Sequence, residues 1–176
     1  MAGDGLRVKL ETRIASMRIT IVAVGRIKAG PETDLAERYT KRFGGTARAL
    51  GLGPIMIHEL PESRDSNASV RKQDEADRLL AKAGGDAVLV VLDEHGCNPT
   101  SAAFADMVAK YRDDGSAEMA FLIGGPDGHG APVLSAARET IALGAMTLPH
   151  GLARVVLLEQ LYRTATILSG HPYHRA

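Results

Sequence analysis

The carboxyl end of the sequence gathers side chains suited to holding a planar, anionic substrate. Arginine can bind phosphate through two parallel hydrogen bonds, and tyrosine or histidine can stack on an unpaired base. From His150 to the terminus Glu159 is the only acid, and the basic or aromatic residues are His150, Arg154, Tyr162, Arg163, His171, Tyr173, His174 and Arg175. This pattern predicts contact with RNA, although a merely solvated tail has a similar composition.

The arrangement His171-x-x-His174 also resembles part of a metal site. No acidic or thiol ligand lies at a supporting spacing, and Pro172 keeps the two histidines off one helical face. We therefore expect no metal here.

Glycine-bearing segments follow three apolar runs, at residues 92–96, 123–128 and 143–150. In open parallel sheets ligands bind beyond the carboxyl ends of strands, and glycine lets a ligand approach the backbone closely. Neither the dinucleotide fingerprint nor the phosphate-loop sequence is present. The second segment is either a tight turn or a wall of a nucleoside pocket. The apolar third segment needs partners for its backbone, either an adenosine-like ligand or neighbouring chain.

These segments are positioned by alternating strands and helices. Apolar runs predict strands at residues 19–24, 55–60, 87–92 and 119–123, with a weaker fifth at 140–147. Helices are predicted at residues 31–43, 66–83, 99–111, 132–140 and 151–169, the third beginning after Asn98 as its N-cap. The alternation predicts one α/β domain, a parallel sheet with helices on both faces.

The last predicted helix is apolar nearly all round, which indicates burial on more than one side. One side would face its own sheet, and the other a second subunit. The alternative is burial inside one large core. We expect a homodimer.

Composition limits the remaining possibilities. The 176 residues carry no net charge, so any RNA site must come from local clustering. The single cysteine, Cys97, in a turn-like stretch, forbids an internal disulfide and suits a reducing compartment, so we expect a cytoplasmic protein. No run is long enough to span a membrane. Residues 1–16 lack a signal-peptide pattern and are expected to be an extension before a domain at 17–176.

Four motifs together resemble the ribosomal RNA large subunit methyltransferase H family, the bacterial pseudouridine N3-methyltransferases. They are Phe121-Leu122-Ile123-Gly124-Gly125-Pro126-Asp127-Gly128, Met146-Thr147-Leu148-Pro149-His150, Leu158-Glu159-Gln160-Leu161-Tyr162-Arg163 and His171-Pro172-Tyr173-His174-Arg175. The similarity runs from about Met17 to Arg175. Asp127 departs from the pattern, because glutamate is common there, and residues 129–131, Gly151 and Ala153 also differ.

The resemblance implies a SPOUT fold with a C-terminal trefoil knot, a homodimer, and S-adenosylmethionine as methyl donor. The implied donor-binding residues are Leu92, Gly124, Leu143, Gly144, Ala145, Met146, Thr147 and Leu148. The implied acceptor is N3 of a pseudouridine in 23S ribosomal RNA, reached as naked RNA, a subunit or an assembled ribosome. We expect the ribosome.

The acceptor nitrogen must lose a proton, and histidine with an ordinary pKa near 6.5 is largely neutral at pH 7 and able to take it. His150 and His174 are the candidates, and the sequence does not decide between them. Arg154 and Arg175 are expected to stabilise the deprotonated ring or hold phosphate, and Tyr173 to stack on the base. Arg163 and His171 are expected to contact RNA.

Two other functions fit the same sequence less well. A non-catalytic RNA- or ribosome-binding protein would not need the glycine-bearing segments intact. A flavodoxin-like oxidoreductase is permitted by the alternating elements but lacks a phosphate fingerprint.

Overall fold

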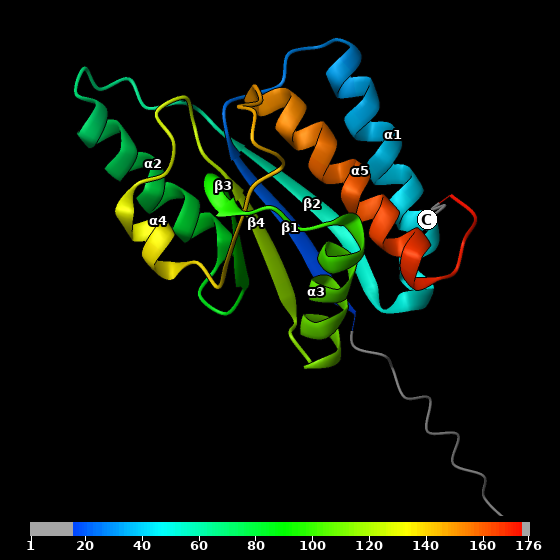
Figure 1. Cartoon of the computed structure of the whole chain (residues 1–176). Helices are drawn as coiled ribbons and strands as arrows, with labels where there is room; N and C mark the ends of the chain where they lie inside the picture. The colour runs from blue at the N-terminus through cyan, green and yellow to red at the C-terminus, as the bar shows by residue number, and fades with distance from the viewer. Residues whose placement is uncertain (1–15, 174–176) are drawn as a thin grey trace, which may run out of the picture.

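Five parallel strands form one sheet at the centre of the molecule (Figure 1). The computed structural model describes residues 16–173, so most of the expected extension, together with His174 and Arg175, lies outside the described residues. The strands are β1 (Met17–Val24), β2 (Leu52–Leu60), β3 (Val88–Cys97), β4 (Glu118–Ile123) and β5 (Glu139–Ile141), in the order β2-β1-β4-β3-β5. The predicted parallel α/β sheet is confirmed.

Helices cover both faces of this sheet, as predicted. They are α1 (Pro31–Ala47), α2 (Ala68–Ala83), α3 (Ser101–Asp113), α4 (Ala131–Ala136) and α5 (His150–Leu168). Helices α2 and α4 pack together on one face, while α5 lies between α1 and α3 on the other (Figure 1). Within residues 16–173, no helix is both long and apolar enough to cross a membrane.

Strand β1 separates two apolar cores. Ile19, Ile21 and Ala23 belong to the core beneath α1, α3 and α5. Val22 and Val24 belong to the core beneath α2 and α4. Successive side chains of a strand point to opposite faces, so a strand covered on both sides must be apolar throughout. This explains the uninterrupted apolar run in the sequence.

Several helix boundaries differ from those predicted. Thr100, not Asn98, caps α3, because its hydroxyl accepts a hydrogen bond from the Ala103 N–H at 3.1 Å. Helix α1 continues through two glycines because Phe43 and Ala47 are buried on either side of them. Burial of an apolar face here outweighs the low helix propensity of glycine. Helix α4 ends at Ala136 rather than at residue 140, since the chain then enters β5.

The region around β5 differs most from the prediction. The weak fifth strand at residues 140–147 is wrong beyond Ile141, where the chain leaves the sheet. The turn-like stretch expected at residues 94–99 is wrong over its first part, since β3 continues to Cys97 after a shift in register, and Cys97 pairs with Ile141. A Cβ on Gly96 would lie 2.6 Å from the Ile141 backbone, so only glycine allows this approach.

Much of the apolar surface of α5 is buried within the chain itself. Leu157, Leu158, Leu161 and Ala165 are inaccessible to solvent, whereas Leu152 near the start of the helix is 41% exposed. Packing between α1, α3 and the sheet therefore accounts for most of the apolar character that the sequence displays.

Helix α2 offers a test of the core. Replacing Leu79, which is 1% exposed, by alanine should lower the free energy of unfolding by ~2–5 kcal/mol, because it leaves a cavity. Val70→Ala on the same helix, at a side chain 48% exposed, should change it by less than ~0.5 kcal/mol. Urea denaturation measures both, and equal losses would contradict this description of the core.

Candidate functional site

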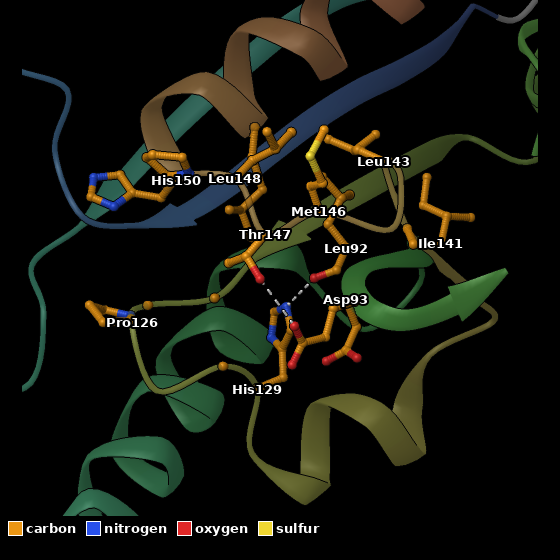
Figure 2. Close-up of a pocket in the computed structure, with 18 of the residues that line it drawn as sticks. Leu92, Asp93, Pro126, His129, Ile141, Leu143, Met146, Thr147, Leu148 and His150 are labelled. Atoms are coloured by element: carbon orange, nitrogen blue, oxygen red, sulfur yellow. Dashed lines mark hydrogen bonds between the residues drawn. The ribbon is translucent and has the colours of Figure 1, made fainter. Parts of the chain in front are cut away.

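The three predicted segments meet around one cavity of about 610 Å³ at the carboxyl ends of β3 and β4 (Figure 2). Residues 92–94 of β3, where its pairing shifts register, contribute one wall, the loop after β4 a second, and the chain between β5 and α5 a third. The lining residues include Leu92, Asp93, Glu94, Ile123, Gly124, Gly125, Pro126, Asp127, Gly128, His129, Leu143, Gly144, Met146, Thr147, Leu148 and His150. The sequence thus located the walls correctly.

Of the expected donor-binding residues, Ala145 alone does not line the cavity. The others are Leu92, Gly124, Leu143, Gly144, Met146, Thr147 and Leu148, and all of them do.

The third wall has a backbone without internal partners. Within residues 16–173, no N–H or carbonyl group of residues 143–148 makes a hydrogen bond to backbone or side chain. The only bond from this stretch comes from the Thr147 hydroxyl, 3.4 Å from a Glu94 carboxylate oxygen. Backbone groups in a partly enclosed cavity need partners, and these can come from water or from a ligand with matching donors and acceptors.

The loop after β4 brings backbone close to the cavity. It closes on itself through a hydrogen bond from the Gly128 N–H to the Gly125 carbonyl at 3.0 Å. Gly128 has a positive φ of 78°, which glycine adopts without strain. A Cβ on Gly124 would lie 3.2 Å from both the Gly128 backbone and the His129 ring, so a side chain there would crowd the wall.

His129 supports this loop from behind. Its ring is only 6% exposed, and Nε2 lies 3.0 Å from the Leu92 carbonyl, which joins the first two walls. Burial lowers the pKa of His129, so the neutral ring is favoured and Nε2 can act as the donor. Sequence reasoning missed this role, since nothing in the sequence indicates which carbonyl the ring meets.

Two carboxylates place negative charge at the edge of the cavity. Burial by itself would raise the pKa of Asp93, but hydrogen bonds from the backbone and ring of His95 outweigh it and lower the pKa. Glu94 lies beside it and accepts from Thr147. Two carboxylates suit a cationic ligand. In the sequence, the position of these two acids directly after the apolar run at residues 87–92 could have indicated this role.

His150 lines the cavity at the first residue of α5. Its ring packs on the backbone of Gly25 at the end of β1, where a Cβ would lie 2.9 Å from Nε2. The close contact holds the ring against the backbone at Gly25, at the margin of the cavity.

Arg154 does not reach the cavity. Its side chain is only 2% exposed, its Nη1 pairs with Glu59, and its Nη2 donates to the Gly25 carbonyl at 3.0 Å. Burial would raise the pKa of Glu59, but hydrogen bonds from Ile27 and Arg154 lower it. The expected contact of Arg154 with the acceptor ring has no support in this placement, since the guanidinium holds Gly25, on which His150 rests.

The remaining described tail residues lie at the opposite end of α5. Glu159 accepts hydrogen bonds from Arg163 Nε at 3.0 Å and from the Tyr173 hydroxyl at 3.1 Å. Burial and this carboxylate raise the pKa of Tyr173 to about 12. His171 is exposed there, and its Nδ1 accepts from the Tyr173 N–H. Arg163 follows His150 by 13 residues, ~20 Å along the helix, and Arg163, His171 and Tyr173 do not line the cavity of their own chain.

The buried His129 ring predicts a pH dependence of stability. Between its lowered pKa and about 6.5, the ordinary value in an unfolded chain, the unfolded state binds more protons. Stability present above pH 6.5 should therefore be lost as the pH falls through that window. His129→Gln keeps a donor for Leu92 but cannot titrate, so its free energy of unfolding should fall less between pH 7 and 5. Equal slopes in urea denaturation at several pH values would contradict this.

Comparison with known proteins assigns the chain to a family. Residues 17–174 match the family described as "Predicted SPOUT methyltransferase". A protein of Bradyrhizobium sp. (strain ORS 278) named "Ribosomal RNA large subunit methyltransferase H" is 50% identical over 160 residues, 91% of this chain and 99% of that protein. A protein of the same name from Brucella anthropi is 48% identical over 160 residues, 91% of this chain and 100% of that protein.

Among solved structures, the SpoU methyltransferase AviRb from Streptomyces viridochromogenes in complex with AdoMet is 17% identical, with a TM-score of 0.39 over 97% of this chain and 67% of that one. The match over nearly the whole described chain, and the identity to near full-length relatives, carry the assignment. The chain belongs to the SPOUT methyltransferase family.

Proposed function

We propose that this protein transfers a methyl group from S-adenosylmethionine to N3 of a pseudouridine in 23S ribosomal RNA. Family membership and the names of relatives about half identical to it support the reaction class and the RNA. The observation that carries the proposal for this chain is the unpaired backbone of residues 143–148 along the cavity. This stretch offers N–H and carbonyl groups without partners, and an adenine edge carries both acceptors and a donor that could bond to them.

The described residues fit such a donor. A cavity of about 610 Å³ lies within the range of small-molecule sites. Leu92, Ile123 and Leu148 supply apolar contacts for a ring, while the carboxylates of Asp93 and Glu94 complement a sulfonium and an ammonium. Bound there, the donor supplies a methyl group already activated by its positive sulfur, so the residues have chiefly to position and to manage one proton.

His150 is the proton acceptor that we propose within the chain holding the cavity. The acceptor nitrogen carries a proton that must leave as the new bond to carbon forms, and a ring nitrogen of His150 is placed to receive it. Arg154 acts as a positioning residue in this scheme, because it fixes the Gly25 carbonyl and the backbone beneath the His150 ring. His174 in the terminal tail remains the second candidate for the proton.

The tail belongs, in this proposal, to the site of a second copy. Arg163, His171 and Tyr173 do not line the cavity of their own chain, and His174 and Arg175 follow Tyr173 directly in the sequence. A homodimer that sets the tail end of one α5 against the cavity of the other would reunite the two groups. The exposed Met146 and Leu152, beside the cavity, would be covered by such a partner.

A trefoil knot is part of the same proposal. Helix α4 lies on one face of the sheet and α5 on the other, so the chain must cross beside β3 between them. The backbones of Gly96 and Ile141 are in close contact, since a Cβ placed on Gly96 would lie 2.6 Å from the Ile141 backbone. This contact supports threading of residues 142–149 beneath the connection from β3 to α3.

A non-catalytic ribosome-binding protein is the alternative function. It would not need a cavity walled by unpaired backbone and two carboxylates, and it should bind neither S-adenosylmethionine nor S-adenosylhomocysteine in calorimetry.

The cellular location in this proposal is the cytoplasm, where ribosomes are found.

Transfer of a labelled methyl group tests the reaction. Purified protein should methylate one pseudouridine of 23S RNA, faster in assembled ribosomes than in large subunits or free RNA, since a chain with no net charge gains little from phosphate attraction alone. Mass spectrometry of the RNA locates the methyl group. Absence of transfer to all three substrates by protein that binds the donor would contradict the proposed acceptor, and equal rates would contradict the preference for ribosomes.

Mixed dimers test the shared site. Deletion of residues 171–176 should abolish transfer while leaving the donor cavity intact, and Thr147→Trp should fill the cavity from an exposed wall residue. Each variant alone should be inactive. Co-refolded mixtures should regain about a quarter of the wild-type activity, because half of the dimers pair one intact cavity with one intact tail. Mixtures that stay inactive while forming dimers would exclude a site built from two chains.

A further inference from the structure

The loop after β4 is rich in glycine, yet it forms a fixed wall of the cavity. Four of its residues, Gly124, Gly125, Gly128 and Gly130, leave the backbone free to adopt many conformations in solution. One internal hydrogen bond, between Gly125 and Gly128, does not fix the loop relative to the sheet, and the bond from His129 to the Leu92 carbonyl attaches only its far end. A wall that must be ordered at each binding event costs affinity, so something outside the loop must hold it.

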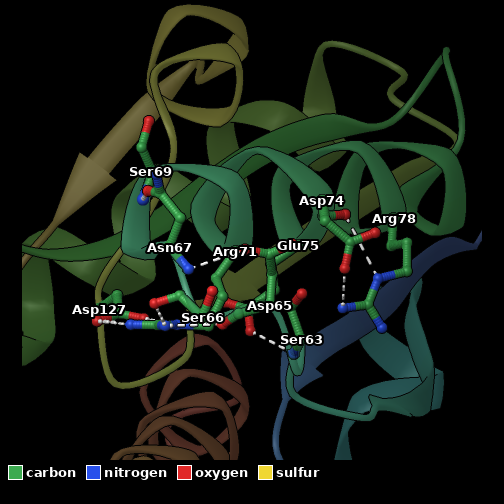
Figure 3. Close-up of polar contacts among 10 residues, drawn as sticks. All are labelled: Ser63, Asp65, Ser66, Asn67, Ser69, Arg71, Asp74, Glu75, Arg78 and Asp127. Atoms are coloured by element: carbon green, nitrogen blue, oxygen red, sulfur yellow. Dashed lines mark hydrogen bonds and ion pairs between the residues drawn. The ribbon is translucent and has the colours of Figure 1, made fainter.

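Helix α2 lies against this loop at three points. A Cβ on Gly125 would come within 2.8 Å of a Glu75 carboxylate oxygen, and one on Gly130 within 2.7 Å of the Lys72 carbonyl. Between these two contacts, Asp127 pairs with Arg71 in the first turn of α2 (Figure 3). The contacts at the two glycines exclude side chains, while the contact at Asp127 supplies attraction.

The Arg71 guanidinium joins three segments of the chain. Nε and Nη2 donate to the two carboxylate oxygens of Asp127 at 2.7 and 3.1 Å. Nη1 donates to the carbonyls of Asp65 and Ser66, in the connection from β2 to α2, at 2.8 and 3.1 Å. A two-point bond between planar groups fixes orientation as well as distance, which lysine cannot reproduce. The hydrogen bond from Arg71 holds the pKa of Asp127 below its usual range, so the pair stays charged at neutral pH.

We propose that Arg71 is a positioning residue for the methyl donor, acting through Asp127 to hold the glycine-rich wall in its binding conformation. The inference rests on the proposed function, since it assumes that the donor occupies this cavity. Arg71 does not line the cavity and touches no reacting atom. Its effect should therefore fall on donor affinity, through the order of residues 124–130, and not on the proton transfer.

Arg78 provides a matched control on the same helix (Figure 3). It pairs with Asp74 at 2.9 Å and donates to the Pro61 carbonyl at 2.8 Å, so it too holds the connection before α2. The arginine side chain is 30% exposed, close to the 26% of Arg71. The two arginines differ in that Arg71 alone also reaches the wall of the cavity.

Calorimetric titration with S-adenosylmethionine and S-adenosylhomocysteine tests the inference without RNA. Arg71→Ala and Asp127→Asn should each weaken binding about tenfold, and the double variant no more than either alone. Arg78→Ala should bind within about twofold of wild type. Unchanged affinity in Arg71→Ala and Asp127→Asn, or equal weakening by Arg78→Ala, would overturn the inference.

Hydrogen exchange separates this inference from the proposed function. Amides of residues 124–130 should exchange faster in Arg71→Ala than in wild type and Arg78→Ala, with no donor present. Equal exchange in the three proteins would overturn the anchoring role. Wild-type protein that binds neither ligand would instead overturn the proposed function, and donor positioning with it, even where exchange shows that Arg71 orders the wall.

Discussion

The functional region depends on the brevity of β5. Its three residues pair with β3, and the last hydrogen bond to the sheet runs from the Ala142 N–H to the Cys97 carbonyl, at 2.7 Å. A longer strand would have satisfied the backbone of residues 143–148 internally and closed the cavity. The shift of register in β3, with Gly96 against Ile141, ends this pairing. The backbone groups that do not bond within the sheet are available to a ligand, because they need hydrogen-bond partners from a ligand or from water.

The loop after β4 and the backbone under His150 are held in place by polar side chains from other parts of the chain. His129 ties the loop after β4 to the Leu92 carbonyl, and Arg71 ties it to α2. Arg154 does the same for the backbone under His150. Each support is a polar side chain bonded to backbone or to a carboxylate from a distant part of the chain. The glycines that shape the walls bring no contacts of their own, so these supports replace what side chains in the walls would otherwise provide.

Sequence reasoning found the sheet and the walls because both follow from local patterns. Apolar runs mark buried strands, and glycines after them mark the carboxyl edge where ligands bind. It failed where a long-range partner decides the outcome. Arg154 looked like a substrate residue because its partner Glu59 lies in another strand. The fifth strand, predicted weakly because of Gly144, was drawn as far as residue 147, because nothing local shows that the pairing of β3 shifts register between Leu92 and Cys97. Ala145 was expected at the cavity by motif position alone, and a side chain in an irregular loop has no periodicity from which to read its direction.

The length of α5 has a consequence for the cell. The helix begins with His150 beside the cavity, and Arg163, on which the Tyr173 ring packs, follows 13 residues later, ~20 Å along the axis. If each active site combines the cavity of one molecule with the tail of another, only dimers are active. While most of the protein is monomeric, the concentration of active sites then rises with the square of the protein concentration. The methylation rate per protein molecule would then rise with expression until nearly all molecules are dimeric. The extent of ribosome methylation would therefore depend on the amount of protein made as well as on the turnover rate of each site.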